Sequence, residues 1–351
     1  MTNSRVPLAT DRSVSASGNS PAALQPRRIS WKSIATWAAD RESAGARRQI
    51  QLALGVIWLV DAALQYQPYM FTRAFAIQVL EPAAAGSPGF VTRPVLFASH
   101  LILHSPVFFD ALFATIQLAI ALGLFWRRTA RAALLGSIIW ALAIWWLGEA
   151  LGGTLTGSAS PVTGAPGAAL LYALIALLAW TSGSRAASVA AGSPLGASWP
   201  KLVWLALWGS EAYYLLTAAN RAPDVLAATI GSGASGEPGW LSYIEVHSAI
   251  LIGTQGGTVS VVLAALFAVI AVGVFVPVVT RPVLILAIVV ASTIWVLGES
   301  FGGILTGQAT DLNTGPLLIL LAAAYWPLAN RPGRPAILVA EPPGGALASG
   351  Y

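Results

Sequence analysis

The sequence contains no cysteine, only two methionines and three histidines, and few charged residues. Without a thiol, the chain cannot form disulfides, thiolate metal sites or a cysteine nucleophile. It also lacks the P-loop, G-x-S-x-G and H-E-x-x-H patterns of nucleotide-binding and hydrolytic sites. Charged residues make up 9% of the chain, whereas an ordinary soluble domain carries about 25%. This scarcity of charge argues against a soluble protein.

The composition is correspondingly rich in apolar residues. The chain is 56% hydrophobic, with a mean hydropathy of +0.71, which predicts a multi-pass protein of the cell (plasma) membrane. Its formal net charge is +5, but the basic residues lie in short loops and near the N-terminus, as membrane topology requires. We therefore expect the lipid bilayer as a partner and no nucleic acid.

One stretch of the sequence occurs twice. Residues 144–157 read IWWLGEALGGTLTG and residues 294–307 read IWVLGESFGGILTG, with ten of fourteen positions identical at a constant offset of 150 residues. Other residues keep the same offset, among them Trp58 with Trp208 and Pro166 with Pro316. Such self-similarity indicates an internal duplication.

Long apolar runs predict the membrane spans. Crossing about 30 Å of hydrocarbon takes roughly 20 residues of α-helix, and most of the runs approach that length. The eight runs are residues 50–67, 107–126, 132–148, 166–180, 202–219, 259–276, 283–298 and 316–329. The predicted fold is an all-α integral membrane protein, with eight transmembrane helices forming two tandem four-helix bundles in the same orientation.

The same runs divide the chain into five parts. They are a partly disordered cytoplasmic tail (1–46), a first four-helix repeat (47–185), a cytoplasmic linker (186–200), a second four-helix repeat (201–330) and a disordered C-terminal tail (331–351). Of the 19 Lys and Arg residues, all but Arg73, Arg93 and Arg221 fall on one side of the membrane in this arrangement. The positive-inside rule then places both termini in the cytoplasm.

Four carboxylates fall within or at the ends of these spans: Asp61, Glu149, Glu211 and Glu299. Asp61 and Glu149 are predicted to lie toward the outer face of the first bundle, and Glu211 and Glu299 toward that of the second. An ionised acid at membrane depth costs about 2.5 to 3.5 kcal/mol on insertion scales, so such residues are usually functional. We expect them to form an outward-facing ligand or proton site. The alternative is that they hold loop backbone groups in place.

Aromatic residues and histidines accompany these acids. Trp145 and Trp295 lie in the duplicated stretch and are expected either to anchor the protein at the interface or to line a ligand pocket. His100 and His247 are included among the candidate ligand-binding residues. His100 and His104 are four residues apart, a spacing that suits a divalent metal, but a third or fourth ligand could come only from Asp110 or the four carboxylates. Metal binding is not expected, because His247 has no second histidine nearby. Asp110 and Gln117 share one face of the second span without equivalent polar partners in the second half, so asymmetry between the halves is expected there.

The sequence resembles the DoxX-like superfamily of four-helix membrane proteins. The resemblance rests on LALGVIWLVDAALQ (52–65), on the segment 94–104, and on LAIALGLFWRRTARAALLG (118–136), which the second half echoes as AVIAVGVFVPVVTRPVLILA (268–287). It covers residues 47–327 as two tandem copies. Members of this kind are similar to membrane subunits of thiosulfate:quinone oxidoreductases, which implies a redox partner protein and a quinone-like ligand.

Three functions therefore remain open. The chain could be a redox-associated membrane subunit or small-molecule binder, whose acids and tryptophans hold a quinone-like ligand near the outer leaflet. It could instead be a transporter or proton-coupled permease. The third alternative is a membrane scaffold without a ligand. Because polar residues are scarce below Asp61 and Glu211, the sequence favours the binder, and it leaves open whether the protein is an enzyme.

Overall fold

The computed structural model describes residues 31–180 and 186–328, and within these ranges it contains helices and no strands. The longer helices of the first half are α1 (Trp31–Gln65), α4 (Gly89–His104), α5 (Pro106–Phe125), α6 (Ala130–Leu147) and α7 (Ala168–Leu178). Those of the second half are α8 (Trp199–Leu215), α9 (Val225–Gly233), α10 (Gly239–Ile252), α11 (Gly256–Gly273), α12 (Thr280–Leu297) and α13 (Thr314–Tyr325).

Short helical turns connect these elements. They are α2 (Arg73–Phe75), the π-helical η1 (Ala76–Leu80), α3 (Glu81–Ala83), and the 3-10 turns η2 (Ala150–Gly153), η3 (Pro161–Thr163), η4 (Ala190–Gly192), η5 (Gly253–Gln255) and η6 (Ser300–Gly303). Residues 1–30 of the predicted N-terminal tail and the whole predicted C-terminal tail (331–351) lie outside the described residues. Residues 31–46, assigned to the N-terminal tail, instead continue as helix into α1.

Four apolar stretches within the described ranges are long enough to cross a membrane. They are α5, α6, α12 and the stretch Gly239–Gly273, which Gly253 divides into α10 and α11. Most side chains of these helices are not buried within the protein, as expected for helices whose outer faces contact lipid.

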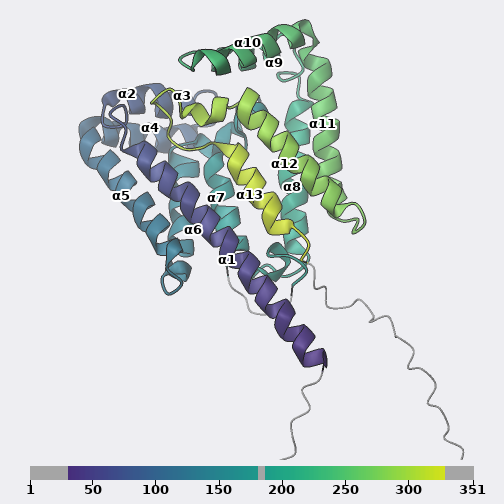
Figure 1. Ribbon diagram of the computed structural model, residues 1–351. Helices are drawn as coiled ribbons and strands as arrows, with labels where there is room; N and C mark the ends of the chain where they lie inside the picture. The colour runs from purple at the N-terminus through teal and green to yellow at the C-terminus, as the bar shows by residue number, and fades with distance from the viewer. Residues whose placement is uncertain (1–30, 181–185, 329–351) are drawn as a thin grey trace, which may run out of the picture.

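The two shortest of the predicted spans lie at the centre of the molecule. α7 and α13 have 11 and 12 residues, which is about 16 to 18 Å of helix and less than the hydrocarbon thickness. Most of their residues are buried, and they pack against each other as well as against α6 and α12. Figure 1 shows α1 running alongside α13, across the front of the bundle. The two halves thus share one core.

The halves differ in the segment before their third long helix. In the first half, α4 packs against η1, α5, α6 and η2, and it contains the segment 94–104 on which part of the DoxX-like resemblance rests. In the second half, α10 packs mainly against α9. Figure 1 shows α10 lying across the end of α11, whereas α4 lies beside α2 and α3. Among the described residues, α4 thus packs along the long helices α5 and α6 of its own half, whereas the contacts of α10 are mainly with α9.

Candidate functional site

A cavity of about 230 Å³ lies inside the first half. Its apolar wall comes mainly from η1, α4, α5 and α6, and its polar end from α1, α7 and the loop before α13. The polar or aromatic residues that line it are Trp58, Asp61, Gln65, Phe75, Phe113, Gln117, Trp140, Glu149, Tyr172, Thr310 and Asp311. An apolar cavity with a few convergent polar groups is the usual form of a small-molecule site.

Asp61 and Tyr172 form the polar centre of this cavity. The Tyr172 hydroxyl donates a hydrogen bond to Asp61 Oδ2, and both side chains are buried, with exposed fractions of 3% and 1%. The Trp58 ring lies against the Tyr172 ring, with 4.2 Å between centroids, and its indole N–H donates to Ser137 Oγ at 2.9 Å. Helices α1, α6 and α7 thereby fix the position of the carboxyl–phenol pair.

Several other polar atoms at this cavity have no partner within the described residues. They are Asp61 Oδ1, Gln117 Oε1, Trp140 Nε1, Glu149 Oε2 and Gln65 Oε1. Buried polar atoms in proteins are nearly always hydrogen-bonded to protein, water or ligand. Because these atoms include both acceptors and a donor, the cavity suits a molecule whose polar head group can accept and donate hydrogen bonds.

Glu149 lies where α6 ends and meets the start of α7. Its Oε1 accepts the backbone N–H of Ala169 at 3.0 Å, so the carboxyl group caps the N-terminus of α7. A Cβ on Gly167 would lie 2.2 Å from Glu149 Oε2, which shows how closely this loop approaches the carboxyl group. Burial, and then the nearby charge of Asp311, raise the pKa of Glu149 from 4.5 to about 8.

The turn η2 brings Glu149 to this position. Residues Ala150 to Gly153 all have positive φ angles, between 47° and 66°, and η6 repeats this left-handed turn from Ser300. Left-handed backbone is unfavourable for non-glycine residues by roughly 1 to 2 kcal/mol each. The Gly-Gly pair of each copy reduces that cost. A Cβ on Gly152 would lie 2.0 Å from the carbonyl oxygen of Pro166, so the turn also needs glycine for close packing.

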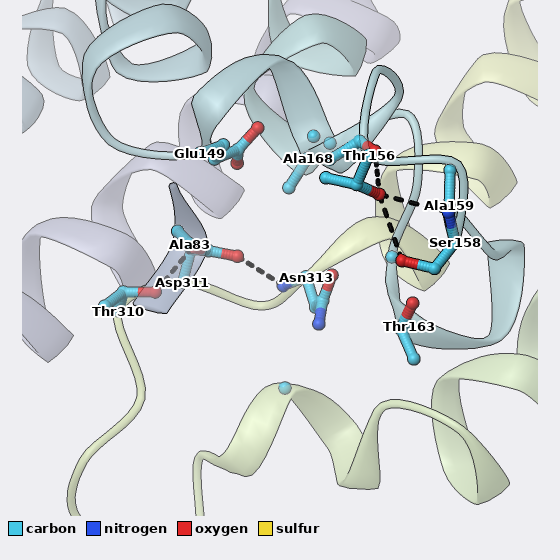
Figure 2. Close-up of a pocket in the computed structure, with 15 residues that line it drawn as sticks. Ala83, Glu149, Thr156, Ser158, Ala159, Thr163, Ala168, Thr310, Asp311 and Asn313 are labelled. Carbon is cyan, nitrogen blue, oxygen red and sulfur yellow. Dashed lines mark hydrogen bonds between the residues drawn. The ribbon is translucent and has the colours of Figure 1, made fainter. Parts of the chain in front are cut away.

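A second, more polar space adjoins the cavity. This vestibule of about 370 Å³ shares Glu149, Ala168, Thr310 and Asp311 with the cavity. Figure 2 shows Glu149 and Asp311 on one side and the hydroxyl residues Thr156, Ser158 and Thr163 on the other. Because Ser158 and Thr163 are exposed, the vestibule lies at the protein surface. Water can thus approach the acids at the polar end of the cavity.

Asp311 comes from the second half of the chain but lies at the polar end of the first-half cavity. Its Oδ2 accepts from the Thr310 hydroxyl at 2.8 Å, and its Oδ1 accepts the Asn313 backbone N–H at 2.6 Å (Figure 2). Burial raises the pKa of Asp311. The candidate site is therefore built by both halves.

In the second half, an aromatic ring occupies the position that is equivalent to part of the polar wall of the cavity. At the offset of 150 residues, Phe267 stands where the first half has Gln117, and its buried ring packs on Trp208 at 5.1 Å between centroids. Glu211, the counterpart of Asp61, is buried, and neither of its oxygens has a partner in the described part of the chain. Glu211 does not line the first-half cavity.

Contacts at the fourth helix of each half show that the constant offset does not extend there. Trp145 Nε1 donates to the carbonyl of Pro166 at 2.7 Å, and Trp295 Nε1 donates to that of Leu312 at 2.8 Å. Pro166 therefore corresponds to Leu312 rather than to Pro316, because the second loop is shorter. By this correspondence Leu318 takes the place of Tyr172, so Glu211 has no phenol partner.

The remaining predicted residues have other surroundings. Glu299 accepts hydrogen bonds from Gly315 N–H at 3.0 Å and from the Thr314 hydroxyl, and so caps α13. Trp145 and Trp295 hold loop carbonyls and do not line the cavity. The side chains of His100 and His247 are exposed, and His247 lies against Tyr243, with 3.7 Å between ring centroids. The structure thus brings Asp61 and Glu149 together and leaves the others outside the cavity.

Sequence reasoning missed Tyr172 and Asp311, and it noted Gln117 only as an asymmetric position. The sequence does contain a recognisable feature at Tyr172 and at Gln117. Tyr172 is the one hydroxyl-bearing residue in the apolar segment AALLYALIALL, and the position equivalent to Gln117 in the second half is Phe267. Asp311 gave no such signal, because the loop that contains it differs in length from the corresponding loop of the first half.

Comparison of the chain with protein-family models, curated proteins and solved structures gave no match.

The raised pKa of Glu149 predicts a pH dependence of stability. Between pH 4.5 and about 8 the folded protein binds this proton more tightly than the unfolded chain does. Its contribution to stability is therefore complete below the unfolded pKa and is lost as pH rises toward 8. We expect the apparent melting temperature in detergent, followed by tryptophan fluorescence, to fall by several degrees from pH 5 to pH 8. In Glu149→Gln, which keeps an acceptor for Ala169, the fall should be smaller; equal slopes would contradict this assignment.

Proposed function

We propose that this chain is a multi-pass membrane protein that binds a small lipophilic molecule with a polar head group, of the quinone kind, in its first-half cavity. The observation that carries the proposal is the buried Asp61–Tyr172 pair at the polar end of an otherwise apolar cavity. As in the resemblance to DoxX-like proteins, which stays a prediction, the protein would serve as a membrane subunit beside a redox partner protein.

The groups in the cavity match the chemistry of a quinone head. A quinone carbonyl accepts hydrogen bonds, whereas a quinol hydroxyl also donates them, so its site needs both kinds of partner. Trp140 Nε1 is an unpartnered donor, and Asp61 Oδ1 and Gln117 Oε1 are unpartnered acceptors. The cavity is smaller than the roughly 300 to 1,000 Å³ of drug-sized sites, which favours a single ring-sized head group.

The vestibule gives this site a connection to water. Glu149 and Asp311 line both spaces, so they stand between the surface and the carboxyl–phenol pair. Carboxyl groups with raised pKa values can exchange protons near neutral pH. If the bound molecule takes up or releases protons with its electrons, these two acids are suitably placed to pass them to or from the vestibule.

A transporter remains the alternative from a different class. Its pathway would have to continue from Asp61 toward the N-terminal part of α1. In that direction α1 contributes Trp58, Ile57 and Leu54 to the packed core, each at most 9% exposed. This packing favours a binder with one entrance over a permease, and the unpartnered cavity atoms favour a binder over a scaffold without ligand.

For the membrane arrangement, we propose eight spans with both halves in the same orientation and both termini in the cytoplasm. The four long apolar helices and the distribution of Lys and Arg support it. In this arrangement α1 and α8 also cross, and the short α7 and α13 lie at the centre, shielded from lipid by the other helices. The vestibule then opens to the outside of the cell membrane.

The absence of cysteine allows a direct test of that orientation. Single cysteines at Ser158 in the vestibule and at Val278 between α11 and α12 would occupy exposed positions. We expect a membrane-impermeant maleimide to label Ser158→Cys in intact cells, and to label Val278→Cys only after the membrane is permeabilised. Labelling of both variants, or the reverse pattern, in intact cells would contradict the proposed topology.

Ligand binding is expected to depend on the first-half acid and not on its second-half counterpart. The probe is decylubiquinone, a quinone with a short alkyl tail, titrated against the tryptophan fluorescence of the purified protein. Asp61→Asn and Tyr172→Phe should each weaken binding by at least about tenfold, or about 1.4 kcal/mol. Glu211→Gln, at the matched buried position, should bind as the unchanged protein does. Equal affinities for all four proteins would remove Asp61 and Tyr172 from the site.

A second substitution tests the cavity itself. Gln117→Phe introduces the residue that the second half has at Phe267 and should fill the head-group space. We expect the loss of decylubiquinone binding with a melting temperature close to that of the unchanged protein, because the aromatic ring packs well in the other half. Phe267→Leu is the control for packing and should leave binding unchanged. Normal binding by a folded Gln117→Phe protein would place the ligand elsewhere.

A further inference from the structure

A separate pocket of about 480 Å³ lies at the other end of α1 and is lined by arginines. Its lining residues are Ala44, Arg47, Arg48, Gln51, Arg127, Arg128, Ala130 and Arg131. Arg47 precedes Asp61 by 14 residues on the same helix, which corresponds to about 21 Å. This basic pocket is therefore distinct from the candidate ligand cavity. No carboxylate lines it among the residues that the structure describes.

Two of these arginines are fixed by backbone contacts. Arg47 Nη2 donates to the carbonyl of Gly192 at 2.9 Å, and its side chain is buried. Arg48 donates to the carbonyls of Leu124 and Phe125 at 2.8 and 2.6 Å, where α5 ends. Carbonyl groups at a helix C-terminus attract a cation. The two positive charges are thus held in place whether or not a ligand is present.

Two more arginines leave their donors available. Arg127 and Arg128 lie in the exposed turn between α5 and α6, and neither donates a hydrogen bond within residues 31–180 and 186–328. Fixed guanidinium groups beside available ones form a site suited to an anion with several oxygens, because a guanidinium matches phosphate geometry in a bidentate manner.

The position of the pocket indicates where this anion would come from. α5 and α6 are both long and apolar enough to span a membrane, and the pocket lies at the turn that joins them. Figure 1 shows this turn at the end of the bundle from which the N-terminal part of α1 projects. Beside it, Leu122 and Trp126 are 56% and 65% exposed. Lipid phosphate groups lie at the ends of spans, with acyl chains against such apolar side chains.

The second half provides an internal comparison. The corresponding space, of about 230 Å³, is lined by Lys201, Val274, Pro277 and Thr280 at the positions of Gln51, Leu124, Arg127 and Ala130. A proline thus stands in place of Arg127, and Val278 in place of Arg128. Arg127 and Arg128 therefore have no basic counterpart at the equivalent positions of the second half.

From the basic pocket we infer a binding site for the phosphate group of an anionic ligand, of which an acidic membrane phospholipid fits the position best. Phosphatidylglycerol and free inorganic phosphate share the chemistry that the arginines recognise. Basic pockets between helices on the cytoplasmic side of a membrane are known to hold such head groups. The proposal is independent of the quinone-like ligand, because the two sites share no residue.

Native mass spectrometry of the full-length protein in mild detergent tests the lipid source. After exposure to phosphatidylglycerol, the unchanged protein should retain at least about tenfold more bound lipid than Arg127→Gln/Arg128→Gln, a difference of about 1.4 kcal/mol. The control, Lys201→Gln/Arg281→Gln, removes the same number of charges from the second half and should retain lipid normally. Phosphatidylcholine, which has no net charge, should be retained weakly by all three proteins.

A second arm tests the free ion. In detergent without added lipid, inorganic phosphate that raises the melting temperature of the unchanged protein and the control, but not of Arg127→Gln/Arg128→Gln, would assign the site to a soluble phosphate. Either selective result supports the pocket as a phosphate site. Equal phosphatidylglycerol retention by the unchanged protein and the double variant, together with no differential effect of inorganic phosphate, would overturn the proposal.

Discussion

The arrangement depends on how two short central helices satisfy their first backbone N–H groups away from bulk water. Unsatisfied N–H groups at the start of a buried helix are costly, and α7 and α13 begin inside the molecule. In each half a glutamate at the end of the preceding long helix accepts these groups: Glu149 for α7 and Glu299 for α13. The left-handed turns η2 and η6 follow directly and bring the loops back to the tryptophans that hold them. The duplicated stretch is therefore first of all a device for joining two helices.

The two halves have similar helix connections, but different residues surround Asp61 in the first half and Glu211 in the second. In the first half, Asp61 meets Tyr172, and Gln117 and Trp140 leave room and unpartnered atoms around them. In the second half, Phe267 fills the matching space and Leu318 replaces the phenol, which leaves Glu211 buried without a partner in the described residues. The second half contributes to the site through Asp311, because α13 packs beside α7. One half thus provides the cavity, and the other completes its polar end.

Two layers of charged side chains, one acidic and one basic, lie at different levels along α1. The acidic layer surrounds the polar end of the cavity and the vestibule, and the basic layer surrounds the pocket at Arg47 and Arg48. Between them α1 contributes Leu54, Ile57 and Trp58 to a packed core without charge. Where these charged groups are buried, as Asp61 and Arg47 are, the low-dielectric environment strengthens their interactions. In the proposed arrangement, the first layer recognises a polar head group near the outer surface, and the second a phosphate near the inner one.

The sequence by itself determined the helical class, the apolar stretches and the twofold occurrence of the W-x-L-G-E motif, because composition and periodicity are local properties. It also singled out Asp61 and Glu149 as costly charges that need partners. The tertiary structure decided which partners they have, because Tyr172, Gln117 and Asp311 reach the cavity from three separate segments. A constant offset between the halves could not reveal the shift that pairs Pro166 with Leu312, since loop length is settled by packing between helices. For the same reason, only the tertiary structure distinguishes Glu299, which caps α13, from Asp61, which lines the cavity.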